Sequence, residues 1–426
     1  MKRLIILIVL FCAGVGYAQF NIEGKITGYE NAPIHIKMFE EGSSRLLKRV
    51  NTNDHGEFHY KFPIEYTGII TFELNNGSFE IVSDNKNISF NTNLKDPNLT
   101  FDYSSGINQT LNKYNEIQQL QGLRDNTLMP LLSFYRQGDV FYENLLDEIS
   151  RINDIEIPVI NSEPINYYLK TKEELKELSS AADASQAALK AKLHLVNDDE
   201  NLENFGFLTP MLSVYISNSL GAAKSREEAT EKIGSALDTL LEEAVAETPR
   251  GQHILSNAIS MLEGNGFTAL SAKYVEQANS MTCEKTGDLK DLLEVQNNIK
   301  VGKKAPNFDL KGTRAKSLYK VKADKKLVIF WASWCPHCLN EMPFVQEFYK
   351  DFKKNDGEII AISLDMDKKA FEEATKDFDW INYSDFLKWD SPIVVQYGVN
   401  ATPTMFMLDK DNKIIQIGSR VSEFKQ

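Results

Sequence analysis

The sequence predicts a multidomain protein with an N-terminal all-β domain of sandwich or barrel-like form, an α-helical middle region and a C-terminal α/β domain. The length of 426 residues suits two or three domains. The spacing of apolar residues changes twice along the chain, from period two to helical spacing and then to alternating strands and helices. We therefore expect a β-rich domain at 19–103, a helical region at 104–299 and an α/β domain at 300–426.

The charge balance narrows the possible partners. The net charge is −13, and nucleic acids and anionic membrane surfaces attract basic proteins. We therefore exclude both as preferred partners. Hydrophobic residues make up 42% of the chain and charged residues 25%, which is typical of an ordinary globular protein.

Residues 1–18 have the form of a secretory signal peptide, with a basic start, an apolar run and small residues before Gln19. The apolar run at 4–13 is shorter than the roughly 20 residues that span a bilayer. Lipid attachment at Cys12 is disfavoured because the bulky Phe11 stands where lipoprotein signals have a small residue. We expect a mature protein in the periplasm or cell envelope, without an anchor at Cys12.

The β-rich prediction for 19–103 depends on apolar residues that alternate with polar ones. Such a period of two is typical of strands with one buried face. Turn-forming sequences such as Asn75-Asn76-Gly77 separate the runs. The alternating apolar positions are Ile34, Ile36 and Met38; Phe58, Tyr60 and Phe62; Ile70, Phe72 and Leu74; and Ile88 with Phe90.

The helical prediction for 104–299 depends on caps and stripes. Ser225 with Glu228 has the form of a capping box, and Thr248-Pro249 offers an N-cap followed by proline at the first helical position. Apolar residues at helical spacing form one stripe, which we interpret as a packing face and not as a cofactor site. The stripe consists of Ile233, Leu237, Leu240, Leu241 and Ala244.

A polar segment with glycine and proline at 300–306 marks the start of the α/β domain. Strands and helices alternate after it, which predicts a central mixed sheet. The expected strands are 326–331, 358–364, 404–408 and 413–417, and the expected helices are 336–350 and 368–378.

Two cysteines with a two-residue spacer lie between the first of these strands and the first helix. They form the motif Cys335-Pro336-His337-Cys338. A cysteine at a helix N-terminus is stabilised as the thiolate, and the thiolate is the species that attacks a disulfide. We therefore predict thiol–disulfide exchange, with Cys335 attacking and Cys338 resolving the mixed disulfide. Cys283 is interpreted as a lone structural or exposed thiol.

Other uses of the cysteine pair fit the sequence less well. A zinc site needs two more ligands at suitable spacing, and covalent haem attachment needs histidine after the second cysteine, where Leu339 stands. A purely structural disulfide does not require the position between a strand and a helix. We expect no metal and no bound cofactor beyond the redox-active pair Cys335–Cys338.

Residues from about 299 to 426 resemble the TlpA/ResA-like branch of the thioredoxin superfamily. The resemblance is carried by 301–308, by 330–338 with the following Glu341-Met342-Pro343, and by 401–404. It implies a thioredoxin-like fold for the last third of the chain and a cis-proline at Pro403 that faces the active site. We assign Trp334, Pro336, Thr402 and Pro403 to substrate binding.

The resemblance also implies a proton acceptor. Thioredoxins have a buried aspartate on the strand before the cysteines, where this chain has Ile329. TlpA/ResA-like proteins use a glutamate at the position of Glu341, three residues after Cys338 and therefore near it on the helix. The hypothesis is that Glu341 assists proton transfer at Cys338. We expect His337 to stabilise the Cys335 thiolate.

The direction of electron flow has two interpretations. The rest of the domain resembles a branch that mostly reduces disulfides, whereas Pro336-His337 is the dipeptide of strongly oxidising DsbA-like proteins. We favour a reductase or isomerase, with an oxidase as the alternative. The partners would be protein thiols or disulfides and, for a reductase, a membrane-bound electron donor.

Two further alternatives remain. The segment at 301–308 also resembles peroxiredoxins, but these have threonine or serine three residues before the reactive cysteine, where Ala332 stands here. The chain could instead be a binding or assembly protein that uses the thioredoxin-like domain as a docking module. Because only a short segment follows Ile417, we expect the last thioredoxin helix to be truncated.

Overall fold

A computed structural model describes residues 20–96, 100–156 and 160–424. The predicted signal peptide and Cys12 lie outside these residues. The chain divides into two compact units. The first comprises Met1–Asn31, Thr52–Gly68 and Val82–Ile165, and the second comprises Ala32–Asn51, Ile69–Ile81 and Asn166–Gln426. Within the described ranges, every helix is too short or too polar to cross a membrane.

The first unit contains a four-stranded sheet in the order β4-β1-β7-β8. β1 runs parallel to β7 and antiparallel to β4. Gly24 on β1 is required by close packing, because a Cβ atom there would lie 2.3 Å from the ring of Phe58. The strands are β1 (Asn21–Thr27), β4 (Glu57–Lys61), β7 (Ile88–Asn93) and β8 (Phe101–Tyr103), followed by the helices α1 (Gly106–Leu123), α2 (Met129–Leu131) and α3 (Val140–Asn153).

A second four-stranded sheet has the order β3-β2-β5-β6. Its strands are β2 (Pro33–Glu40), β3 (Ser43–Asn51), β5 (Thr67–Leu74) and β6 (Gly77–Asp84). The two sheets confirm the predicted β-rich N-terminal part. The alternating residues Ile34, Ile36 and Met38 are buried as expected. His35, between them, is also fully buried, so β2 is covered on both faces, which the alternation did not indicate.

The middle region is helical, as predicted, and both predicted caps form. The Ser225 side chain accepts a hydrogen bond from the Glu228 N–H, and the Thr248 side chain accepts one from Gly251. The predicted stripe is buried except for Ala244, which is half-buried because α8 ends one residue before it. The helices are α4 (Glu163–Ser179), α5 (Ala184–Asn197), α6 (Asn201–Asn204), α7 (Leu208–Leu220), α8 (Arg226–Glu243), α9 (Pro249–Gly264), α10 (Thr268–Ser280) and α11 (Gly287–Asn298).

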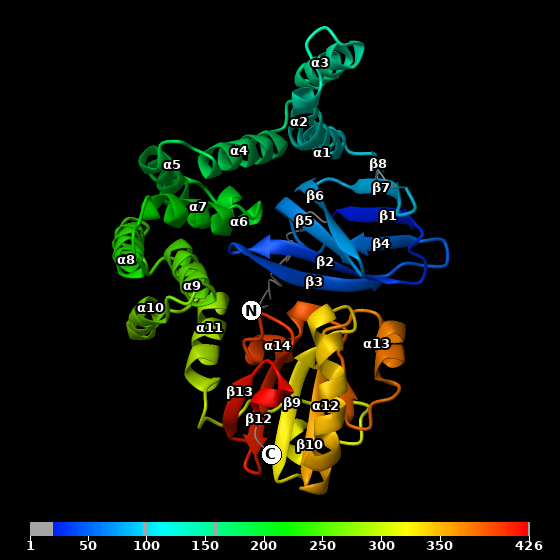
Figure 1. The fold of residues 1–426 in the computed structure, drawn as a ribbon, viewed down its shortest axis with the longest axis vertical. Helices are drawn as coiled ribbons and strands as arrows, with labels where there is room; N and C mark the ends of the chain where they lie inside the picture. Colours follow the sequence, from blue (N-terminus) through cyan, green and yellow to red (C-terminus); the bar gives the residue numbers. More distant parts are fainter. Residues whose placement is uncertain (1–19, 97–99, 157–159, 425–426) are drawn as a thin grey trace, which may run out of the picture. The chain divides into compact units, whose positions relative to one another are not determined.

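The C-terminal part contains a mixed five-stranded sheet in the order β11-β10-β9-β12-β13. β9 and β10 are parallel, and β12 is antiparallel to β9. In Figure 1, α12, in yellow, lies along one face of this sheet. The elements are β9 (Lys325–Trp331), α12 (Pro336–Lys354), β10 (Gly357–Ser363), α13 (Lys368–Thr375), β11 (Ile381–Tyr383), α14 (Pro392–Gln396), β12 (Thr404–Asp409) and β13 (Ile414–Gly418).

β9 occupies the centre of this sheet and is buried on both faces from Lys326 to Trp331. A continuous apolar run is typical of such a strand because packed layers cover it on each side. The strand ends four residues before Cys335, and α12 begins at the next residue, Pro336. The fold therefore places the cysteine motif at the carboxyl end of its central strand.

Within the second unit, the strands β2 and β5 contact the segment that follows β11. The buried His35 ring has its Nε2 atom 3.1 Å from the carbonyl oxygen of Phe386. Because a carbonyl only accepts, Nε2 carries the proton in this contact. Burial lowers the pKa of His35 to about 4, against a smaller opposing effect of the Glu73 carboxylate. His35 is therefore neutral in the folded protein at neutral pH.

We predict that His35 makes the fold sensitive to acid. Between the folded pKa of about 4 and the usual value of 6.5, the unfolded chain binds more protons, so stability falls as the pH falls. The loss from this residue is on the order of 3 kcal/mol between pH 7 and pH 4. In urea unfolding at several pH values, the free energy of unfolding of His35→Gln should depend less on pH than that of the wild type. The exposed His59, changed to Gln, serves as the control, and equal pH dependence in both variants would contradict the prediction.

Candidate redox-active site

Cys335 and Cys338 form a disulfide with their Cα atoms 5.2 Å apart. Cys335 is the N-cap residue of α12, and its sulfur accepts a hydrogen bond of 3.1 Å from the Cys338 N–H. Cys335 is 5% exposed and Cys338 is fully buried. The predicted pair is thus joined at a helix N-terminus, and only Cys335 presents surface to a reactant. Pro336 and His337, between them, are exposed.

A loop with a cis-proline lies opposite the pair. The Thr402–Pro403 peptide bond is cis, as the resemblance implied. The Cys335 sulfur lies 3.5 Å from the carbonyl oxygen of Thr402, so the loop places a backbone acceptor directly against the reactive sulfur. A free thiol at Cys335 would find a hydrogen-bond acceptor there.

A groove of about 720 Å³ adjoins the cysteine motif. It is bounded by the start of α12, the cis-proline loop and the segment after β13, and its lining includes His337, Glu341, Phe344, Pro403 and Arg420. Phe344 is 65% exposed and offers an apolar surface. Of the eight site residues predicted from the sequence, His337, Glu341, Thr402 and Pro403 line this one groove.

Glu341 is half-buried, and its Oε1 atom accepts a hydrogen bond of 2.8 Å from the Val421 N–H. This contact joins α12 to the short helical turn at Val421–Glu423 and fixes the direction of the carboxylate. Ile329, where thioredoxins have an aspartate, is fully buried on β9. Glu341 is therefore an acidic side chain on the helix of Cys338, held in place by a backbone donor.

Asp365 holds the loop before the cysteines, a role that no sequence pattern predicted. Its carboxylate is 1% exposed and accepts hydrogen bonds from the Ser333 N–H, the Ser333 hydroxyl and the Ser363 hydroxyl. A carboxylate that accepts from several donors is a firm anchor in a buried place. The loop between β9 and Cys335 is thus tied to the end of β10, 32 residues later in the chain.

Trp334, directly before Cys335, is 44% exposed. The ring of Trp389 meets it edge to face, with centroids 6.5 Å apart, and the Lys388 ammonium lies 5.4 Å from the Trp334 ring centroid. Trp334 therefore forms an apolar surface beside the reactive sulfur, held by two residues that were not predicted. Their neighbourhood in space could not be deduced from a sequence distance of more than 50 residues.

One group of metal-ligand type appears among the described residues: His35, Glu73 and Asp390. Both carboxylates already have ammonium partners, since Glu73 pairs with Lys37 and Lys388, and Asp390 pairs with Lys37. A divalent cation would have to displace these lysines, so we assign the group to structure.

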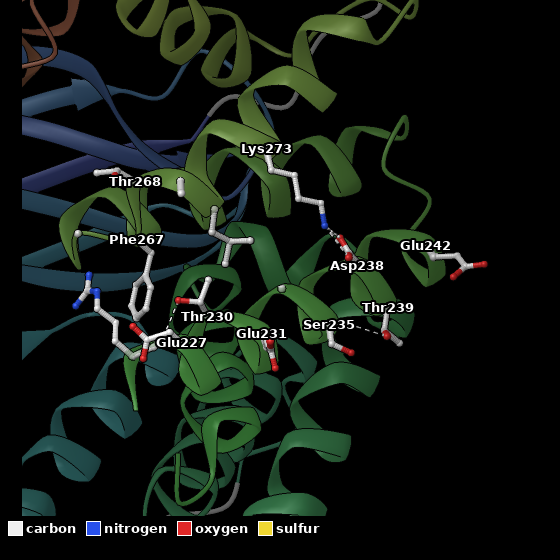
Figure 2. A pocket seen from close by; sticks show the side chains of 15 residues that line it. Glu227, Thr230, Glu231, Ser235, Asp238, Thr239, Glu242, Phe267, Thr268 and Lys273 are labelled. Atoms are coloured by element: carbon white, nitrogen blue, oxygen red, sulfur yellow. Dashed lines mark hydrogen bonds and ion pairs between the residues drawn. The ribbon is translucent and has the colours of Figure 1, made fainter. Parts of the chain in front are cut away.

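The helical region carries a groove of about 880 Å³ beside α8 and α10. Figure 2 shows Glu227, Glu231 and Glu242 along it and the ion pair between Asp238 and Lys273. It has no cysteine or histidine among its lining residues. We find no catalytic arrangement among these lining residues.

The mixed sheet, the helix that begins at the cysteine pair and the cis-proline loop define a protein of the thioredoxin superfamily. Comparison with known proteins gives the same class. The Redoxin family model matches residues 300–424.

Similar curated proteins indicate a narrower group within the thioredoxin superfamily. The chain is 35% identical over 124 residues to "Thiol-disulfide oxidoreductase ResA" of Bacillus thuringiensis subsp. konkukian, covering 28% of this chain and 70% of the relative. It is 30% identical over 122 residues to ResA of Bacillus subtilis, covering 28% of this chain and 68% of the relative. A solved thiol-disulfide oxidoreductase from Bacteroides fragilis shares 31% identity over 27% of this chain and 89% of that chain, with a TM-score of 0.25.

The chain belongs to the TlpA/ResA-like family of thiol–disulfide oxidoreductases. It is a redox enzyme. The family match is confined to the C-terminal part of the chain, which is the part that contains the cysteine pair, the cis-proline loop and Glu341.

We predict that Asp365→Ala loosens the loop before the cysteines. The change leaves the Ser333 and Ser363 donors without their acceptor in a buried place, which should cost about 2 kcal/mol of unfolding free energy. All four tryptophans lie between 331 and 389, so their fluorescence in urea reports on this domain. The exposed Asp377, changed to Ala, is the control, and equal stability of the two variants would contradict the prediction.

Proposed function

We propose that the chain is an exported thiol–disulfide oxidoreductase that exchanges the Cys335–Cys338 pair with protein substrates, as a reductase or isomerase. The observation that carries the proposal is the position of Cys335 as the N-cap of α12. Helix N-terminal N–H groups and the helix dipole favour a negative charge on that sulfur. The reactive thiolate is thus stabilised by the same backbone groups that start the helix.

The difference in exposure between the two sulfurs supports an order of events. In the reduced enzyme, the Cys335 thiolate attacks one sulfur of a substrate disulfide, and the other substrate sulfur leaves as a thiolate. The Cys338 thiolate then attacks the Cys335 sulfur, which releases the second substrate thiolate. The substrate gains two electrons and two protons, and the enzyme is left with the Cys335–Cys338 disulfide.

Cys338 is fully buried, so its thiol needs a nearby group to take its proton before it can attack. We assign this task to Glu341, which lies one helical turn later and has its carboxylate oriented by the Val421 N–H. With Ile329 in place of a strand aspartate, the proton acceptor comes from the helix.

Substrate binding is assigned to the exposed surface around Cys335. Trp334 and Pro336 flank Cys335 in the chain, the Thr402 carbonyl oxygen lies 3.5 Å from its sulfur, and Thr402 and Pro403 line the adjoining groove. An extended substrate segment can lie along this groove, with its disulfide sulfur against Cys335 and its backbone against the cis-proline loop. Backbone pairing of this kind recognises chain shape and admits several protein substrates.

The direction of electron flow is proposed from the family match. A reductase needs a membrane-bound donor that returns two electrons to the disulfide, and an isomerase keeps the pair partly reduced. The proposed signal peptide at 1–18 would bring the enzyme to the periplasm or cell envelope, where such donors and substrates meet. The DsbA-like alternative is motivated by the exposed His337 at the helix N-terminus, which favours the reduced thiolate form.

The first test is the reduction potential of the Cys335–Cys338 pair in the chain without residues 1–18, equilibrated with glutathione or dithiothreitol buffers. We expect a value nearer to about −270 mV, the thioredoxin potential, than to about −120 mV, the DsbA potential. A value near the DsbA potential would favour the oxidase. A pair that does not titrate would contradict the enzymatic proposal. The double variant Cys335→Ser/Cys338→Ser serves as the blank of the titration.

A second test addresses Glu341. Glu341→Gln keeps an oxygen that can accept from the Val421 N–H but removes the basic carboxylate. We expect the rate at which Cys338 resolves a mixed disulfide to fall by roughly tenfold or more near pH 7. Stopped-flow measurements from pH 5 to pH 9 give the rate profile. Glu347→Gln, on the same helix and exposed in a pair with Lys350, is the control; a wild-type profile in Glu341→Gln would rule out the role.

A further inference from the structure

Four alternating charges join the strands β2 and β5 to the segment at 386–390. Lys388 Nζ lies 2.5 Å from Glu73 Oε1, Lys37 Nζ lies 2.9 Å from Glu73 Oε2, and Lys37 Nζ also lies 2.6 Å from Asp390 Oδ2. The four side chains are between 14% and 17% exposed. Charges with so little contact to water are weakly screened by salt, and the loss of one leaves its partner uncompensated.

Lys388 takes an unusual backbone conformation. Its φ angle is +56°, in the left-handed region that disfavours residues with a Cβ atom and suits glycine. Residues remain in this region when the surrounding contacts hold them there. The Lys388 side chain supplies two such contacts, one to the Glu73 carboxylate and one to the face of the Trp334 ring.

The contacts of Lys388 connect the charged cluster to Trp334 at the redox site. Trp334 directly precedes Cys335 and exposes 44% of its surface. An ammonium over an aromatic face is attractive, and an edge-to-face aromatic contact fixes the ring from another side. Lys388 and Trp389 provide these two restraints. The ring orientation beside the reactive sulfur therefore depends on how Lys388 is held.

We propose that Glu73 and Lys388 are positioning residues for protein substrates: Glu73 on β5 holds Lys388, and Lys388 holds the Trp334 ring beside Cys335. The inference rests on the proposed exchange of protein disulfides. It assigns a function to the sheet β3-β2-β5-β6, because β5 helps to shape the surface on which a substrate chain docks. A small dithiol needs no such surface, so its reaction with Cys335 is independent of the link.

The test compares Glu73→Gln, Lys388→Met and the double variant in the chain without residues 1–18. With insulin as the protein substrate, each single change should raise KM by about three- to tenfold, the range of an aromatic–cation contact, and leave kcat within about twofold. The KM of the double variant should not exceed that of the more impaired single variant, because both changes break the same link. The rate with dithiothreitol should stay the same.

A second readout follows the Trp334 ring itself. The chain has four tryptophans, so labelling with 5-fluorotryptophan gives four fluorine signals, and Trp334→Phe identifies the one from Trp334. This signal should shift in Glu73→Gln and in Lys388→Met, while the signals of the buried Trp331 and Trp380 stay in place. Unchanged Trp334 signals in both variants would overturn the proposal. Because this measurement requires no turnover, it is separate from a failure of the proposed exchange activity.

Matched variants separate positioning from loss of fold. Lys388→Arg keeps the charge and the ring contact and should leave KM within about twofold of wild type. Lys388→Gly removes both contacts but relieves the left-handed backbone, so it should fold and still show the raised KM. Lys376→Met, which breaks an exposed pair with Glu373 in the same domain, should change nothing. A folded Lys388→Gly variant with wild-type KM would overturn the proposal.

Discussion

The hydrogen bond from the Cys338 N–H to the Cys335 sulfur is the contact on which the redox site depends. Serine, threonine, asparagine and aspartate are the preferred residues for capping the first turn of a helix with a side-chain oxygen, whereas here the cap atom is the Cys335 sulfur. A thiolate accepts such a bond more strongly than a disulfide sulfur does, because the charge adds to the bond and to the helix dipole. Reduction of the pair therefore strengthens the start of α12, and oxidation weakens it.

Because of this coupling, the residues around the cap influence the reduction potential of the cysteine pair. Whatever stabilises the Cys335 thiolate raises the potential of the pair, and whatever stabilises the disulfide lowers it. We propose that His337, at the start of the helix, acts in the first direction. Proton removal from the buried Cys338 lowers the barrier to its attack, so in the proposed role Glu341 acts mainly on the rate of exchange. The direction of electron flow and the rate of disulfide exchange are thus assigned to different side chains.

The sequence predicted those parts of the molecule whose signals are local. The strand, the cysteine pair and the start of α12 follow one another directly, and the caps at Ser225 and Thr248 lie within three residues of the groups they bind. Asp365 was missed because its partner Ser333 is 32 residues away and an isolated aspartate after a strand has no distinctive pattern. Burial of His35 was missed for a related reason: alternation describes one face of a strand, and the second face of β2 is covered by residues more than 300 positions later.

The position of Lys388 shows how such distant contacts determine a local conformation. Its neighbours in sequence do not favour a left-handed lysine, and a chain cut to the family-matched residues 300–424 would lack both Lys37 and Glu73. Lys388 would then keep its attraction to the Trp334 ring but lose the carboxylate that opposes its charge, and Asp390 would lose its ammonium partner. The chemistry of the pair is encoded within one domain, whereas the surface next to it is completed by strands from the other end of the chain. A domain studied alone and the full chain should therefore agree on the reactivity of Cys335 toward small thiols and differ in how they bind proteins.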